Sequence, residues 1–193
     1  MKTGTITSKE ELTLKIKKSS KIATVLARIT GIVGIVGIVL AMVIIGIMLV
    51  DYTAFTTFFP DNMAFDVVGE YVIQSAGDYI AAFTDSLVEF LIYTACAFLA
   101  AGIFKRISED GMPFKTENTK SLKVIGILII ASSFIPTFLA SIAGYASGAY
   151  TGENLTVMVR VNLDAAMIGA LFFMIATIFS YGAKLQQEND DMV

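Results

Sequence analysis

The sequence predicts an all-α membrane protein: a bundle of four transmembrane helices, with a small extracellular β element formed by its two outer loops. Four long apolar stretches predict the spans, namely residues 29–50, 86–104, 124–152 and 165–183. Together they contain one charged residue, Glu89. A helix needs about 20 apolar residues to cross a bilayer core of ~30 Å. Because 55% of the 193 residues are hydrophobic, most of the chain is expected to lie in lipid.

The predicted elements follow one another within a single domain. They are a basic leader (1–21), a first span (22–50), an outer loop (51–77), a second span (78–106), a cytoplasmic loop (107–120), a third span (121–146), an outer loop with a strand (147–163), a fourth span (164–185) and a cytoplasmic tail (186–193).

Basic residues predict the orientation of these spans. Seven precede the apolar residues 29–50 of the first span: Lys2, Lys9, Lys15, Lys17, Lys18, Lys21 and Arg28. Five more lie between the apolar residues 86–104 and 124–152 of the second and third spans: Lys105, Arg106, Lys115, Lys120 and Lys123. Short segments rich in Lys and Arg stay on the cytoplasmic side of a membrane. Both termini are therefore expected inside, in a bacterial cytoplasmic membrane.

The leader is expected to be a solvated basic segment that sets this topology. An alternative is a short amphipathic helix on the membrane surface, starting at the capping box of Ser8 and Glu11. Leu12 and Ile16 would then form an apolar pair one turn apart.

Three glycines of the first span, Gly31, Gly34 and Gly37, predict close helix packing, because small residues let backbones approach in lipid. They either form the seam of a homo-oligomer or pack against a neighbouring span of the same chain. We favour the second interpretation, since a four-helix bundle already needs such contacts.

The outer loops predict a small antiparallel ribbon. Residues 154–163 alternate between apolar and polar, and residues 65–73 are rich in β-branched and aromatic side chains. Asp78 and Asp164 are expected to cap the helices that follow these loops. Within the third span, Pro136 predicts a kink, with nearby hydroxyls satisfying the freed carbonyl.

Asp85 and Glu89 are the strongest indication of a polar site within the membrane. They lie four residues apart, on one face of the second span near its outer end. With Arg160 and Asp164 they make up a candidate intramembrane polar cluster. Its members either bind a cation, proton or outward-facing ligand, or form an internal ion pair, or include a protonated Glu89. We favour the structural interpretations, since one acid pair near an interface is not a transport pathway.

Two polar segments share a pattern with a known family. The first reads Glu109-Asp-Gly-Met-Pro-Phe114, then Glu117-Asn118 and Leu122; the second reads Tyr181-Gly-Ala-Lys-Leu185-Gln-Gln-Glu-Asn-Asp190. With four spans at this spacing, they resemble the YoaS-like family of small bacterial four-span membrane proteins of unknown function. Members typically carry Gly-x-Pro-Phe…Asn between spans two and three, and a Gly-x-x-Leu-x-x-Glu-Asn-Asp-like tail.

The resemblance implies a cytoplasmic protein partner, because genes of this family often neighbour one for a small Cro-like helix-turn-helix regulator. The candidate partner surface comprises Gly111, Pro113, Phe114, Asn118, Glu188, Asn189 and Asp190. Physically, Gly111 permits a left-handed turn, Phe114 suits an anchor in the membrane interface, and Thr116 or Asn118 suits a helix cap. The alternative is that this loop is only a well-built turn.

Composition argues against catalysis. The chain has no histidine and one cysteine, Cys96, so zinc fingers, Cys–His catalysis and redox pairs are not expected, nor is any cofactor, metal or direct contact with nucleic acid. The leading hypothesis is a non-enzymatic sensor or anchor that binds the small regulator. Alternatives are a small channel or transporter using Asp85 and Glu89, and an immunity or envelope-stress protein acting through its outer loops.

Overall fold

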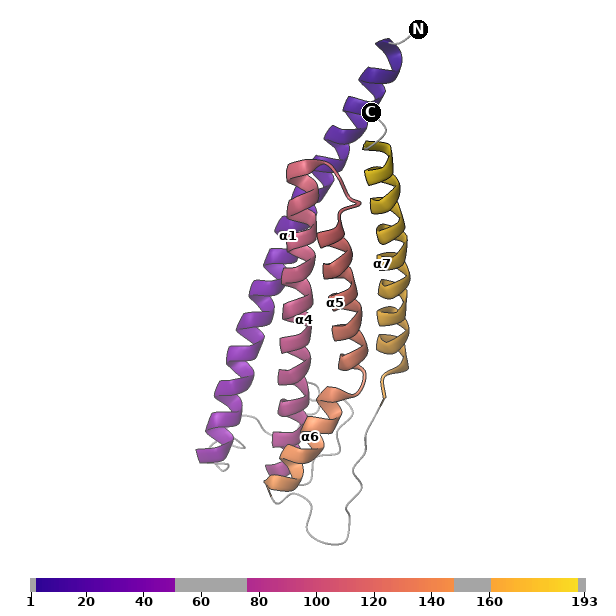
Figure 1. Ribbon diagram of the computed structural model, residues 1–193. Coiled ribbons are helices and arrows are strands. Elements are labelled where there is room, and N and C mark those ends of the chain that lie inside the picture. Colours follow the sequence, from indigo (N-terminus) through magenta and orange to yellow (C-terminus); the bar gives the residue numbers. More distant parts are fainter. Residues whose placement is uncertain (1–2, 51–75, 148–160, 191–193) are drawn as a thin grey trace. The chain divides into compact units, whose positions relative to one another are not determined.

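The computed structural model describes residues 3–50, 76–147 and 161–190, and these residues form five α-helices (Figure 1). The helices are α1 (Thr3–Val50), α4 (Ala76–Asp110), α5 (Thr116–Ser132), α6 (Ile135–Ala146) and α7 (Leu163–Asp190). These ranges contain no strand. The predicted ribbon, formed from residues 65–73 and 154–163, lies almost entirely outside them.

Three helices, α1, α4 and α7, are long and apolar enough to cross a membrane, and the pair α5 and α6 adds a fourth span if it is counted as one broken helix. Their large apolar side chains are widely exposed, for example Val33, Leu40, Leu171 and Ile178. Such exposure is expected of surfaces that face lipid, whereas a soluble protein would bury them. The predicted all-helical, multi-pass class is confirmed at this level.

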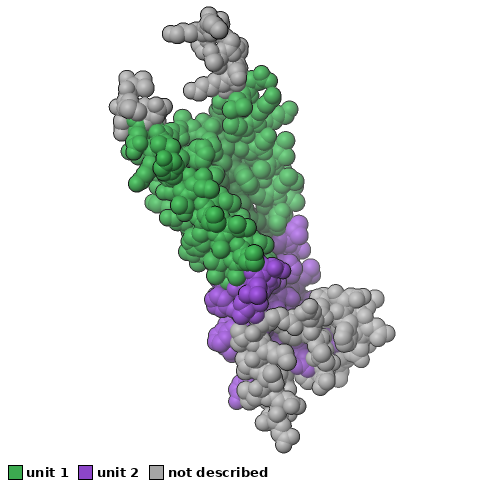
Figure 2. Space-filling model, turned by 90° about the vertical axis from the view of Figure 1, so that its right-hand side faces the viewer, with its two compact units in different colours: residues 1–32, 93–130, 166–193 green, residues 33–92, 131–165 purple. Residues whose placement is uncertain are grey.

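The chain divides into two compact units, which Figure 2 colours green and purple. Unit 1 comprises residues 1–32, 93–130 and 166–193, and unit 2 comprises residues 33–92 and 131–165. Each unit has its own apolar cluster. In unit 2 this cluster consists of Met48 from α1 with Tyr79 and Phe83 from α4.

The core of unit 1 joins three helices. Ile103 and Ile107 of α4, Leu122 and Ile125 of α5, and Ala176 of α7 are buried together. In α4 and α5 the paired positions lie three or four residues apart, which places each pair on one face of its helix.

Unit 1 also contains a close approach between two helix backbones, at Gly126 of α5 and Gly169 of α7. A Cβ atom on Gly126 would lie 3.0 Å from the carbonyl oxygen of Gly169, and one on Gly169 would lie 2.9 Å from that of Gly126. Helices in lipid associate through such close packing, because the surrounding acyl chains provide no hydrophobic driving force. The absent side chains of these two glycines therefore set the distance between α5 and α7.

The glycines of the first span pack within the chain. In unit 1, a Cβ atom on Gly31 would lie 2.9 Å from the ring of Phe98, and in unit 2 one on Gly37 would lie 3.1 Å from the ring of Phe90. Gly34 is buried. Both phenylalanines belong to α4, so contacts between α1 and α4 account for Gly31 and Gly37 without a second copy of the chain.

The third predicted span is interrupted near its proline. α5 ends at Ser132, α6 begins at Ile135, and Pro136 occupies the first turn of α6, where its missing N–H is tolerated. At the break, the carbonyl of Ser133 accepts a hydrogen bond of 2.8 Å from the backbone N–H of Asn162. Asn162, which immediately precedes α7, thus bonds to a carbonyl that would accept a hydrogen bond within an unbroken helix.

Two predicted caps are wrong. The side chain of Asn162, not of Asp164, caps α7, because its Oδ1 accepts a hydrogen bond of 3.1 Å from the N–H of Ala165. Asp164 and Asp78 instead lie inside the first turns of α7 and α4. A carboxylate there still favours the helix dipole, but it does not begin the helix.

The leader is the first part of α1 rather than a separate segment. α1 begins at Thr3, so the helix start predicted from Ser8 is wrong. Ile16 packs against the core of unit 1, whereas Leu12, one turn earlier on the same helix, is exposed. Ile16 of the predicted leader is therefore partly buried, and the leader's place as a cytoplasmic segment that sets topology stays a prediction.

A matched pair of alanine substitutions tests the packing of α5 on α7. Gly169→Ala places a methyl group against the backbone of Gly126 and is expected to destabilise the protein by about 1–3 kcal/mol. Gly46→Ala makes the same change where no atom lies within 4 Å, and should leave stability unchanged or slightly raised. Thermal unfolding in detergent measures both variants, and equal midpoints would contradict the close packing.

Candidate functional site

The 107–120 loop begins with a glycine that ends α4. Gly111 has φ = +74°, the only positive φ among the described residues, and its N–H donates a hydrogen bond of 2.8 Å to the carbonyl of Ile107. This is the αL form of helix C-cap, which strongly favours glycine because other residues strain in this conformation. The predicted left-handed turn at Gly111 is confirmed.

Asn118 holds the loop in place. Its side chain is fully buried; Oδ1 accepts a hydrogen bond of 2.8 Å from Nε of Arg106, and Nδ2 donates one of 2.9 Å to the carbonyl of Pro113. Arg106 in turn donates through Nη2 to the hydroxyl of Ser121 at 2.9 Å. One amide therefore links the end of α4, the turn of the loop and the start of α5.

Thr116 and Asn118 do not cap the third span as predicted. α5 begins at Thr116, and the carbonyl of Lys115 accepts the N–H of Thr119 at 3.1 Å. Asn118 lies inside the first turn of α5, and its side-chain amide forms hydrogen bonds with Arg106 and Pro113 instead of capping the helix. Its burial also removes it from the candidate partner surface.

Phe114 packs the loop onto α7. Its ring centroid lies 5.0 Å from that of Phe179, and a Cβ atom on Gly182 would lie 2.7 Å from the Phe114 ring. The ring therefore rests on the bare backbone of Gly182, while 39% of the Phe114 surface stays exposed, so its predicted role as an anchor in the membrane interface stays a prediction. This contact joins the two segments that carry the family resemblance, since Phe114 belongs to the first and Gly182 to the second.

The start of α1 lies on another side of the loop. A Cβ atom on Gly111 would lie 2.9 Å from Cε of Lys17 and 3.0 Å from Cγ2 of Thr13. The close approach of α1 and the positive φ both favour glycine at this position. Within unit 1, three separate parts of the chain thus converge on residues 111–118.

Part of the surface of the 107–120 loop remains exposed. Met112 is 45% exposed and accepts a hydrogen bond of 3.2 Å on its sulfur from Nε2 of Gln186. Glu117, Lys120 and Glu188 are exposed too. Lys115 and Asp110 form a surface ion pair of 2.5 Å across the loop. The exposed part of this region therefore combines the flexible apolar side chain of Met112 with charged side chains of both signs.

Other members of the predicted partner surface are less accessible or lie outside the described side chains. Gly111 and Pro113 are half-buried. Asn189 and Asp190 belong to the last turn of α7, so the predicted tail begins as helix. Their side chains lie outside the described part of the structure.

The intramembrane cluster is described only in part. Asp85 and Glu89 are half-buried one turn apart on α4, in unit 2. Asp164 is exposed in the first turn of α7, and Arg160 lies outside the described residues. The predicted pairing with Arg160 therefore stays a prediction. Among the described residues, no group of three or more His, Cys, Asp or Glu side chains is placed to hold a metal.

Sequence reasoning missed three residues that shape the site. The sequence indicates only a role in topology for Arg106, because a base twelve residues before an asparagine gives no sign of pairing. Gly182 belongs to the tail motif, but its spacing from Leu185 does not indicate that it packs against Phe114. Gly126 lacked a second small residue at helical spacing, so it gave no packing signal.

No family model, no curated protein and no solved structure matches this chain. The likeness to the YoaS-like family therefore stays a prediction from the two polar segments.

Replacing Asn118 tests whether its amide fixes the loop. Asn118→Leu leaves Nε of Arg106 and the carbonyl of Pro113 without their partner, and is expected to cost about 1–3 kcal/mol. Trypsin should then cut after Lys115 about tenfold faster or more in the purified protein.

The control is Glu117→Gln, which changes an exposed neighbour of Asn118 and should leave the cleavage rate unchanged. Equal cleavage rates for Asn118→Leu and Glu117→Gln would contradict a loop fixed by the amide.

Proposed function

We propose that this chain is a non-enzymatic, multi-pass protein of the bacterial cytoplasmic membrane that anchors a cytoplasmic protein partner. Both termini and the 107–120 loop face the cytoplasm in this proposal, because the segments rich in Lys and Arg lie there. The partner would bind the exposed side of the loop together with the neighbouring end of α7.

The observation that carries this proposal is the buried amide of Asn118, which bonds to both Arg106 and Pro113. A connector between two spans only needs to turn the chain, and a short polar turn achieves that. Here contacts with α1, α4, α5 and α7 hold the loop in one shape while Met112 stays exposed. A preformed surface binds a partner at a lower cost in conformational entropy than a flexible one.

The composition of the exposed face suits a protein partner. Methionine adapts its shape to apolar partner surfaces, and it is favoured at binding sites for that reason. The same loop and the neighbouring end of α7 also carry the exposed charged residues Glu117, Lys120 and Glu188. Apolar centres with polar rims are the usual anatomy of protein interfaces.

A small helix-turn-helix regulator is the partner that the family resemblance favours. In that case the regulator contacts DNA, and this chain holds the regulator at the membrane. Binding would lower the regulator's free concentration, and a change in the loop would release it.

Photo-crosslinking in native membranes tests the proposal. A benzophenone side chain in place of Met112 is expected to capture one small cytoplasmic protein, identified by mass spectrometry. The matched control places the same probe at Leu171, which is exposed on the apolar face of α7 and should capture no soluble protein.

Adding Asn118→Leu to the Met112 probe should reduce capture at least fivefold, since the loop then loses its fixed shape. Capture at Met112 that does not exceed capture at Leu171 would contradict the anchor proposal.

A further inference from the structure

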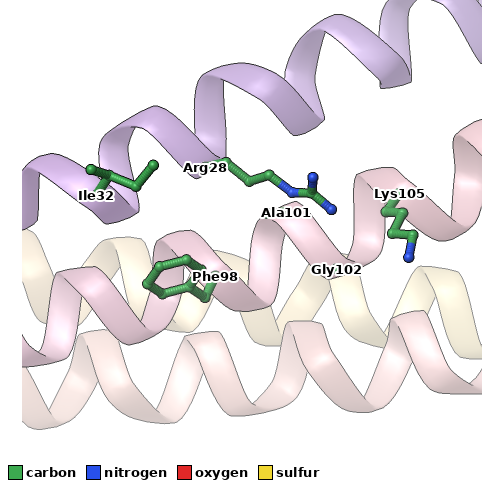
Figure 3. Close-up of a pocket in the computed structure, with 6 residues that line it drawn as sticks. All are labelled: Arg28, Ile32, Phe98, Ala101, Gly102 and Lys105. Atoms are coloured by element: carbon green, nitrogen blue, oxygen red, sulfur yellow. The ribbon is translucent and has the colours of Figure 1, made fainter. Parts of the chain in front are cut away.

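A pocket of about 300 Å³ lies between α1 and α4 in unit 1 (Figure 3). Its lining combines two bases with an apolar wall: Arg28, Ile32, Phe98, Ala101, Gly102 and Lys105. Ile32 and Phe98 are 58% and 43% exposed, so the pocket is a groove on the surface of the helices rather than an enclosed cavity.

The two bases mark the same depth in the membrane. Arg28 immediately precedes the uncharged residues 29–50 of α1, and Lys105 immediately follows the uncharged stretch of α4 that ends at Phe104. A segment that enters the bilayer and the next one that leaves it meet the same interface at these two points. The groove thus has its cationic end at the proposed cytoplasmic surface and its apolar end towards the lipid core, as the positions of Arg28 and Phe98 in Figure 3 illustrate.

Both charges are available to a ligand. Arg28 is exposed and forms no ion pair with a described acid. Lys105 makes one loose, exposed contact of 3.7 Å with Glu109, a kind of pair that contributes little. By contrast, the neighbouring Arg106 already donates to Asn118 and Ser121. The chain therefore directs one base of the Lys105–Arg106 pair inward and leaves the other outside.

Space for a ligand comes from Gly102. A Cβ atom there would meet only one group within 4 Å, Nη1 of Arg106 at 3.6 Å. Packing does not explain the missing side chain, unlike those of Gly31 and Gly126, and a larger residue would extend into the groove.

We propose that this groove binds an anionic phospholipid of the cytoplasmic leaflet. Arg28 and Lys105 hold the headgroup phosphate, and an acyl chain lies against Ile32, Phe98 and Ala101. A guanidinium group can donate two parallel hydrogen bonds to the oxygens of one phosphate. Basic pockets between membrane helices are suited to acidic headgroups. A free phosphate would use the two bases but leave the apolar wall without a partner. The lipid site stands independently of the anchor proposal, because it uses neither Met112 nor the loop.

Native mass spectrometry tests the site on the full chain, purified in a mild detergent and titrated with phosphatidylglycerol. Each base near a membrane surface contributes about fivefold to the binding of acidic lipid. The double variant Arg28→Gln, Lys105→Gln is therefore expected to bind at least tenfold more weakly than the unmodified protein. The control Lys21→Gln, Lys123→Gln removes the same charge from exposed bases outside the groove and should change binding by less than twofold.

Four further outcomes decide the proposal. Gly102→Leu fills the groove without changing charge, and it should weaken binding as much as the double variant does. Wild-type binding of phosphatidylcholine as tight as that of phosphatidylglycerol would overturn the selectivity for acidic lipid. Displacement of the bound lipid by 10 mM inorganic phosphate would identify a phosphate site instead and overturn the role of the apolar wall. Equal binding by the pocket and control double variants would overturn the site itself.

Discussion

The amide of Asn118 forms the interaction on which the loop end of the structure depends. It satisfies a donor on Arg106 and an acceptor on Pro113 while remaining out of contact with solvent. A buried polar group that loses its hydrogen-bond partner destabilises the fold. These bonds therefore favour one arrangement of the end of α4, the turn of the loop and the start of α5 over alternative arrangements. Phe114 then meets Gly182 of α7 from that fixed position. The shape of the surface around Met112 follows from this chain of contacts, and the proposed function rests on it.

Glycine plays a different part in each region of unit 1. Gly126 and Gly169 bring α5 and α7 into backbone contact, and Gly182 receives an aromatic ring. At Gly111, the backbone adopts a conformation that ends α4. Gly102 leaves a groove open beside two bases. In lipid, where burying apolar surface yields little, these local fits decide how the helices meet.

How far the sequence predicts this structure depends on the range over which each signal acts. Lengths of uncharged sequence predicted the long apolar helices, because the thickness of the bilayer sets the length of a span. Gly111 was predictable since its role is local. Helix caps are harder to predict. Asp164 and Asn162 are both good capping residues two positions apart, and only the contact of Asn162 with Ser133, in another part of the chain, selects between them. Arg106 pairs with Asn118 across the loop, and Gly182 packs against Phe114 from a distant part of the chain; no local pattern reveals such pairs.

The central claim is that the amide of Asn118 holds the 107–120 loop in one shape against α7. Double electron–electron resonance between nitroxide labels at Met112 and Lys184, in a Cys96→Ser background and a lipid bilayer, measures this directly. Both positions are exposed and belong to unit 1. The account predicts one narrow distance distribution that broadens when Asn118→Leu is introduced. A broad distribution in the chain that retains Asn118, unchanged by the substitution, would contradict it.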